Sequence, residues 1–157
     1  MHRSSSSFLR FSCGVLLLGT GTMAPHALAD AAGSGNVEFA SCARQFSAVT
    51  IEKAIAKPGR SVTVPVVFQP AEGWLIKAQS ATTLRLFPPA GVSTPQPLMK
   101  SQDAVLNEQR GHFNVVLTSE ETGQKTIPGA LTFMVCTSNG SACEPQIAKL
   151  SIELTVQ

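Results

Sequence analysis

The thiols of Cys136 and Cys143 are the side chains of this chain whose type and spacing point most directly to chemistry. Six residues separate them, and Asn139-Gly140 stands at the centre of that interval. An Asn-Gly pair between strand-like segments favours a two-residue type I′ hairpin turn, which needs a positive φ at both positions. Such a turn sets the two cysteines opposite each other, with Cα atoms about 4.5 to 5.5 Å apart, a separation that a disulfide tolerates. The interval therefore predicts a hairpin that can carry a disulfide near its tip.

The segments on either side of this turn alternate like two strands that bury one face. Their apolar positions are Leu131, Phe133 and Val135 in the first segment and Ala148, Leu150, Ile152 and Leu154 in the second. The turn pairs Leu131 with Ala148, so the two apolar sets share one face, as a common core requires. Cys136 and Cys143 have the opposite parity. We expect both of them on the outward face, within reach of another protein's thiol.

Pro145 conflicts with this register. It stands opposite Met134, at a position expected to donate a ladder hydrogen bond, and proline has no N–H. The sequence therefore predicts either a bulge after Glu144 or a regular ladder that ends at the cysteines. A longer loop would keep Cys136 and Cys143 close without placing them in direct opposition.

The rest of the chain is also patterned as β-structure, and no helical period of comparable strength appears. Alternating apolar residues mark further strands: Val49, Ile51 and Ile55; Val62, Val64, Val66 and Phe68; Leu84 and Leu86; Phe113, Val115 and Leu117. These strands predict an all-β, immunoglobulin-like antiparallel β-sandwich of about seven to eight strands, with a closed barrel as the competing architecture. Residues 74–77 are a further strand candidate. Pro65 indicates an edge strand, and residues 92–110 are the longest expected loop.

The first 29 residues have the parts of a secretory signal peptide: a basic start, an apolar stretch and the A-x-A cleavage site Ala27-Leu28-Ala29. A membrane anchor is disfavoured because the apolar stretch is too short and too interrupted to span a bilayer core of about 30 Å. We expect cleavage after Ala29, a flexible lead-in over residues 30–46 and one domain over residues 47–157. The mature protein would then be periplasmic or secreted, where thiols are oxidised by default.

The charge balance argues against several classes of partner. Lys and Arg number 12 and Asp and Glu number 10, and loss of Arg3 and Arg10 with the signal peptide makes the two numbers equal. We therefore expect no basic patch for nucleic acid or anionic lipid. No membrane insertion is expected after signal cleavage.

The remaining metal-binding or proton-binding side chains form no strong motif. Cys42 is the third cysteine of the mature chain and is expected to be a semi-buried bystander; pairing with a hairpin cysteine or joining two chains are the alternatives. His112 is the only mature histidine and is expected at the surface, so no histidine-based triad or multi-histidine zinc site is predicted. A Cu(I) site built from the cysteine pair with Met134 and Met99 is a minor alternative to methionine packing. No metal or cofactor is predicted.

The order of these segments resembles the amino-terminal periplasmic domain of the DsbD family of thiol:disulfide interchange proteins. The resemblance covers most of the chain from residue 46 onward, and the segments that carry it are Ser61 to Phe68, Glu72-Gly73-Trp74-Leu75-Ile76, Leu84-Arg85-Leu86-Phe87-Pro88-Pro89, Ala130 to Cys136, Cys143-Glu144-Pro145 and the terminal strand. It implies an immunoglobulin-like sandwich in which Cys136 and Cys143 are a redox pair. That pair would pass reducing equivalents from a thioredoxin-like domain to periplasmic acceptors. The resemblance also aligns residues 98–107, which contain no aromatic residue, with the family's aromatic cap loop.

Two functions are expected of the cysteine pair. The first is exchange with thioredoxin-like or other thiol:disulfide exchange proteins, in which a partner thiolate attacks Cys136 or Cys143 and the remaining cysteine resolves the mixed disulfide. The alternative is a non-catalytic binding or structural β-sandwich domain whose disulfide is a passive staple. Glu144 adjoins Cys143, and no Lys, Arg or His lies near the pair in the sequence. Activation of a thiol would therefore have to come from the fold or from the partner.

Overall fold

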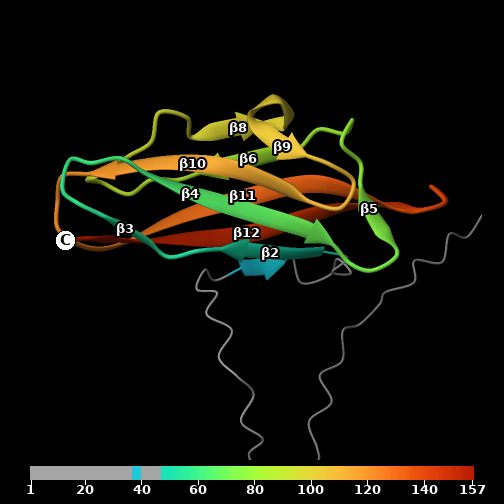
Figure 1. Ribbon diagram of the computed structural model, residues 1–157, viewed down its shortest axis with the longest axis horizontal. Coiled ribbons are helices and arrows are strands. Elements are labelled where there is room, and N and C mark those ends of the chain that lie inside the picture. Colours follow the sequence, from blue (N-terminus) through green and yellow to red (C-terminus); the bar gives the residue numbers. More distant parts are fainter. Residues whose placement is uncertain (1–36, 40–46) are drawn as a thin grey trace, which may run out of the picture. The chain divides into compact units, whose positions relative to one another are not determined.

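The computed structural model describes residues 37–39 and 47–157, which form an all-β sandwich of two sheets (Figure 1). The expected signal peptide, its cleavage site and Cys42 lie outside the described residues. Val37–Phe39, inside the expected lead-in, form the short strand β1. Within the described ranges there is no helix with the length and apolar character needed to cross a membrane.

The larger sheet has the strand order β1-β12-β11-β6-β8, with β3 beside β12 and β5 beside β11. Its strands are β1 (Val37–Phe39), β3 (Ala54–Ala56), β5 (Trp74–Ile76), β6 (Thr83–Leu86), β8 (Leu98–Lys100), β11 (Gly123–Thr137) and β12 (Cys143–Val156). Its pairs are antiparallel except for β3 with β12, which is parallel.

The smaller sheet has the order β2-β4-β10-β7, with β9 also beside β10. Its strands are β2 (Ser47–Ile51), β4 (Val62–Pro70), β7 (Val92–Ser93), β9 (Ala104–Leu106) and β10 (Gly111–Ser119), and the short 3-10 helix η1 (Ser101–Asp103) links β8 to β9. Strands of two or three residues account for half of the twelve described strands, which is why the alternation of apolar residues predicts fewer.

The core lies between the two sheets, where the expected apolar faces of β11 and β12 meet the smaller sheet. The predicted core positions are all buried: Leu131, Phe133, Val135, Ala148, Leu150, Ile152 and Leu154. The ring of Phe133 lies against Phe68 of β4, with centroids 4.6 Å apart, and Phe68 lies 6.1 Å from Phe113 of β10. The contact between Phe133 and Phe68 joins the two sheets, and Phe133 lies three residues before Cys136 on β11.

Pro65 does not mark an edge strand, because β4 lies between β2 and β10. The pairing of β2 with β4 ends at Ile51 and Val66, and Pro65 is the next residue of β4. On the β2 side Pro65 therefore has no strand partner among the described residues. A proline is tolerated there because no ladder hydrogen bond is lost.

Two further expectations are wrong in detail. Ile55 is 63% exposed, while its neighbours Ala54 and Ala56 are buried. Alternation assigns the larger side chain to the core, but the register of β3 with β12 sets Ala54 and Ala56 beside the buried Leu154 and Val156, so Ile55 faces outward with Thr155. Residues 92–110 are not one long loop; they form β7, β8, η1 and β9, which are held by pairing with β6 and β10 rather than by their own β-propensity.

Replacing Phe133 by Ala should test how tightly the two sheets are joined. Phe133 is 1% exposed, and its truncation leaves a cavity in the core. We expect the free energy of unfolding to fall by about 3–5 kcal/mol, measured by urea titration of the oxidised protein. Thr132→Ala, at the neighbouring outward position, is the control and should cost less than about 1 kcal/mol. Equal losses in the two variants would contradict the assignment of the faces.

Candidate functional site

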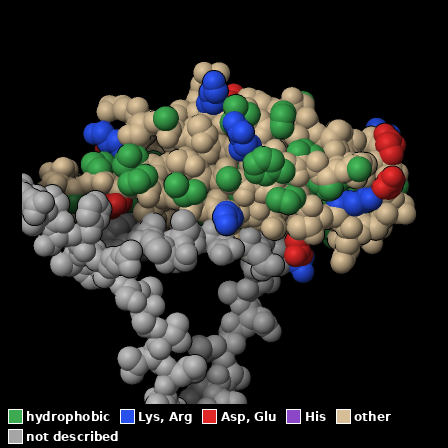
Figure 2. All heavy atoms as spheres, turned by 180° about the vertical axis from the view of Figure 1, so that it is seen from behind, with side chains coloured by type: hydrophobic (Ala, Val, Ile, Leu, Met, Phe, Trp, Pro, Cys, Tyr) green, Lys and Arg blue, Asp and Glu red, His purple; other side chains and the backbone are tan. Residues whose placement is uncertain are grey.

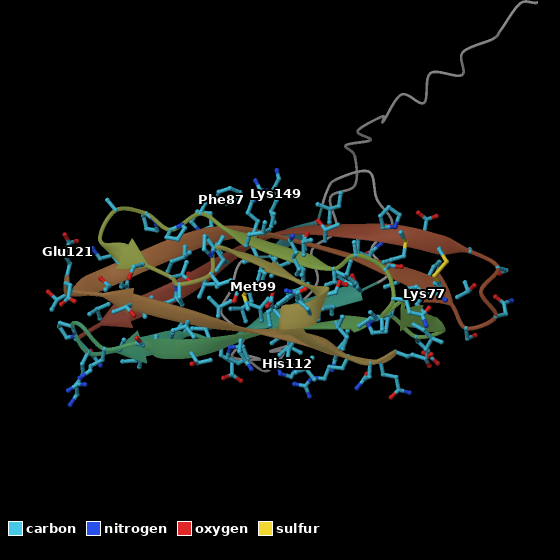
Figure 3. The ribbon with its side chains drawn as sticks, turned by 90° about the horizontal axis from the view of Figure 1, so that it is seen from above. Lys77, Phe87, Met99, His112, Glu121 and Lys149 are labelled. Carbon is cyan, nitrogen blue, oxygen red and sulfur yellow. A yellow bond between two sulfur atoms is a disulfide. The ribbon has the colours of Figure 1, made fainter. Side chains whose placement is uncertain are left out.

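Cys136 and Cys143 form a disulfide at the end of the β11–β12 hairpin (Figure 3). The two residues are partners in the antiparallel register, and their Cα atoms are 4.0 Å apart. The same register runs without interruption from this pair to Gly123 and Val156 at the other end of the two strands. The predicted opposition of the two cysteines is confirmed.

The loop between the cysteines differs from the predicted type I′ turn. Gly140 has a φ of 71°, but Asn139 does not have a positive φ. The Gly140 N–H donates to the Thr137 carbonyl at 2.8 Å, and the Thr137 N–H donates to the Ala142 carbonyl at 2.9 Å, which leaves a four-residue loop over 138–141. A two-residue loop and a four-residue loop with the same centre give the same strand register. The longer loop takes one more residue from each strand and leaves the pairing of the other residues unchanged. The predicted register therefore holds although the predicted turn type is wrong.

Asn139 stabilises this loop through its side chain rather than through its backbone conformation. Its Oδ1 atom accepts hydrogen bonds from the Thr137 hydroxyl at 2.7 Å, the Ser141 N–H at 3.0 Å and the Ser141 hydroxyl at 2.8 Å. Short side chains that bond to the backbone two residues on are typical of turns. The tip of the hairpin is thus ordered by a local hydrogen-bond network next to the disulfide.

Pro145 fits the regular ladder without a bulge. It pairs with Met134, and the pairing continues on both sides of it. The Met134 carbonyl accepts the Lys77 N–H at 2.9 Å, so the backbone groups of Met134 point away from β12. Met134 and Pro145 are therefore a non-hydrogen-bonded pair, in which β11 does not require an N–H from Pro145. The predicted bulge, and the predicted end of the ladder at the cysteines, are both wrong.

The two cysteines differ in exposure. Cys136 is only 6% exposed, whereas Cys143 is exposed. At this position β11 has partners on both sides, because Leu75 of β5 pairs with Cys136 on the side away from Cys143. β12 pairs with β1 only as far as Ala148. Between Ala148 and Cys143 no strand among the described residues lies on its other side. The expectation that both thiols are accessible is therefore wrong for Cys136, since parity sets the direction of a side chain but not what covers it.

Lys77 is a cation near the pair that the linear sequence does not reveal. The register of β5 with β11 continues to Lys77, whose N–H bonds to Met134, two residues before Cys136. Lys77 and Cys136 are thus diagonal cross-strand neighbours, with a backbone separation of roughly 7–8 Å. A nearby ammonium group favours a thiolate over a thiol. Only the pairing of β5 with β11 could have predicted this neighbour, because the two residues are distant in the sequence.

The segment aligned with the family's cap loop, residues 98–107, forms β8, η1 and β9, and its strands pair with β6 and β10. The aromatic residue paired next to the disulfide is Trp74, the register partner of Thr137. Trp74 is half-buried and packs against the core. The residue that pairs with Cys136 itself is Leu75, which is apolar but not aromatic.

The Cu(I) set considered from the sequence is not assembled. Met99 is buried in the core, whereas Cys136 and Met134 have the outward parity of β11. His112 is half-buried on the outer face of the smaller sheet, between Val67 and Val105 in the register. Across the described ranges, no group of three or more His, Cys, Asp or Glu residues is placed to hold a metal ion.

The fold and the site define an all-β sandwich with a disulfide at the end of its longest hairpin. No protein-family model matches the chain, and no curated protein matches its sequence. Neither comparison identifies a DsbD-like domain, and the resemblance remains a prediction from the sequence.

Gly140→Ala should test the conformation of the hairpin loop. The substitution adds a side chain at a φ of 71°, in open space where the new Cβ meets nothing within 4 Å. Because left-handed backbone costs a non-glycine residue roughly 1–2 kcal/mol, we expect the free energy of unfolding to fall by that amount in a urea titration. Ser138→Ala, exposed in the same loop, is the matched control and should change little. No loss in Gly140→Ala, or an equal loss in both variants, would contradict the observed loop.

Proposed function

We propose that this protein is an exported thiol:disulfide exchange module that passes reducing equivalents to partner proteins through Cys136 and Cys143. The observation that carries the proposal is a disulfide with one exposed and one buried cysteine. Exchange needs one sulfur that a partner thiolate can attack. It also needs a second sulfur that acts as the leaving group and later re-forms the internal disulfide. Exposed Cys143 suits the first role, and buried Cys136 suits the second.

The position of the bond in the chain favours exchange over a passive staple. The disulfide joins residues that the hairpin already holds opposite each other, and their sequence separation is only 7. In the chain-entropy model a cross-link stabilises a protein less when it closes a shorter loop. A staple at this point therefore adds less stability than one between distant segments would.

The reducing half-reaction begins when a thiolate of a thioredoxin-like donor attacks Sγ of Cys143. A bond forms between the donor sulfur and Cys143 while the bond to Cys136 breaks, and Cys136 leaves as a thiolate that takes up a proton. The second donor thiolate then attacks the donor sulfur of the mixed disulfide and releases Cys143. The donor ends as a disulfide and the module as a dithiol, so two electrons have moved.

The transfer half-reaction runs in the other direction, from the dithiol to an acceptor disulfide. The Cys143 thiolate attacks one acceptor sulfur, and the other acceptor sulfur leaves as a thiolate and is protonated. Cys136 then attacks Sγ of Cys143, restores the internal disulfide and releases the first acceptor sulfur. The Cα separation of 4.0 Å keeps Cys136 next to the mixed disulfide that it must resolve.

The surroundings and the compartment support the same roles. Lys77, a diagonal neighbour of Cys136, is a cation that favours the thiolate released in each cycle. The signal peptide expected over residues 1–29 would deliver the module to the periplasm or outside the cell. Disulfides form and persist in such compartments, so a donor would be needed to reduce the pair.

Single-cysteine variants should trap one mixed disulfide and not the other. In a Cys42→Ala background, which removes the third thiol, reduced Cys136→Ala and Cys143→Ala are incubated with a thioredoxin that keeps only its attacking cysteine, activated as a mixed disulfide with thionitrobenzoate. The thiolate of the variant attacks the thioredoxin sulfur, thionitrobenzoate leaves, and neither protein has a second thiol to resolve the product. We expect Cys136→Ala to accumulate several times more mixed disulfide on non-reducing gels, because its remaining Cys143 is exposed.

Mass spectrometry of the trapped complex would identify the linked cysteine. Equal trapping by the two variants, or more trapping by Cys143→Ala, would contradict the assignment of Cys143 as the attacked sulfur. No mixed disulfide with either variant would argue for the alternative function, a non-catalytic sandwich domain with a structural disulfide.

A further inference from the structure

The outer face of the larger sheet carries four exposed cations, and we call this surface the cationic face. They are Lys77 after β5, Arg85 in β6, Lys100 in β8 and Lys149 in β12. Arg85 and Lys149 flank Ala130 of β11 from its two sides. Seen from behind, Lys and Arg side chains lie among hydrophobic ones, and Asp and Glu side chains appear mainly near the margins (Figure 2).

Arg85 lies at the middle of the cationic face without an acidic partner. The salt bridges within the described part of the chain are Lys53 with Glu153 and Lys125 with Glu121. Neither of them includes a cation of this face. The equal numbers of acidic and basic residues expected in the mature chain therefore conceal a local excess of positive charge.

Two acidic residues stand at the edges of the face. The backbone N–H of Lys100 and the side chain of Gln96 hold the pKa of Asp103 below its ordinary value, so Asp103 stays ionised beside Lys100. Glu153 has the same outward parity as Lys149, four residues further along β12, and its carboxylate lies 3.8 Å from the ammonium group of Lys53. Neither acid is next to Arg85, where the positive charge is least offset.

Exposed apolar side chains lie between these cations. Phe87 is 52% exposed, Ile147 is 47% exposed and Leu98 is 38% exposed. Phe87 and Lys149 point away from the sheet on the same side (Figure 3), and both line a hollow of about 540 Å³ whose floor is formed by β11 and β12. Aromatic side chains beside a hollow are typical of the anchoring region of a protein interface.

We propose that the cationic face is the docking surface for the redox partner, and that this partner is an acidic thioredoxin-like protein that seats an apolar side chain in the hollow. The inference rests on the exchange function proposed above. Charge complementarity favours an acidic partner, and it disfavours a second copy of this chain, which would bring like charges together.

The dimensions of the face fit one partner domain that also reaches the disulfide. Cys143 and Ser151, which lies at the hollow, are both on β12, and their separation along the strand is roughly 27 Å. A standard interface of about 800 Å² per partner is roughly 28 Å across. A domain in contact with Cys143 can therefore cover the face as far as Phe87.

Charge reversal at the far end of the face should slow reduction by a protein without changing the disulfide itself. Lys149 is roughly 20 Å along β12 from Cys143, about twice the Debye length at 0.1 M salt. For Arg85→Glu/Lys149→Glu we expect kcat/KM for reduction by a thioredoxin of net negative charge to fall about tenfold at low ionic strength. The difference should shrink at high salt, and the rate with dithiothreitol at about 0.1 M salt, where screening separates the two sites, should be unchanged.

Matched controls separate local contact from overall charge. Lys57→Glu/Arg60→Glu makes the same change in net charge just after β3, whose Ala56 pairs with Val156 at the end of β12 opposite Cys143. This control should keep most of the rate with thioredoxin. Phe87→Ala should also slow thioredoxin, whereas Val105→Ala, which is 60% exposed on the smaller sheet, should not.

The outcomes distinguish the docking surface from the exchange function. If thioredoxin reduces the wild type and the Arg85→Glu/Lys149→Glu variant equally fast, the docking surface is wrong and the exchange function stands. If thioredoxin does not reduce the wild type, the exchange function fails, and the docking surface fails with it. Dimerisation, or co-sedimentation with anionic phospholipid vesicles, that is lost only in the variant would assign the face to another occupant and overturn the proposal.

Discussion

Fourteen residue pairs hold β11 and β12 in one unbroken antiparallel register, from Gly123 with Val156 to Cys136 with Cys143. Because side chains alternate with a period of two, this register decides which residues enter the core and which face outward. It buries Phe133 against the smaller sheet, and it sets Lys149 and Ile147 on the same outward face as Cys143. The disulfide, the floor of the hollow and the place of Lys149 on the cationic face follow from it.

Much of this arrangement could be predicted from the sequence, because the signals for it are local. Alternation of Leu131, Phe133 and Val135 defines the core face of β11, and an Asn-Gly pair marks the centre of the loop. The turn type could not be read with the same certainty, since two-residue and four-residue loops about one centre produce the same pairing. Pro145 conflicts with the ladder in the sequence prediction because alternation does not tell which residues of a strand donate hydrogen bonds toward a given neighbouring strand.

The features that sequence patterns missed depend on contacts between distant segments. The burial of Cys136 and the nearness of Lys77 both follow from the pairing of the three-residue strand β5 with β11. Short strands of this kind carry too few residues to show a period, and the same holds for the strands within residues 92–110. The segregation of charge onto one face likewise appears only when Arg85 of β6 and Lys149 of β12 are brought to either side of β11.

The exchange chemistry that we propose for this site depends on unequal access to two sulfur atoms held close together. At the disulfide β11 has β5 on its other side and Cys136 is buried, whereas β12 has no second strand partner there among the described residues and Cys143 is exposed. A cationic, partly apolar sheet face on the strand that carries the exposed cysteine offers a place for a protein donor, whereas a structural staple needs no such surface. The two proposals thus explain the asymmetry of the disulfide and the asymmetry of charge together.

The reduction potential of the Cys136–Cys143 disulfide tests the central claim most directly. It would be measured on the mature protein in a Cys42→Ala background, by equilibration against defined dithiol and disulfide mixtures. Exchange predicts a potential between about −300 and −120 mV, the range of thiol:disulfide oxidoreductases. A potential below about −300 mV, typical of structural disulfides, would contradict it.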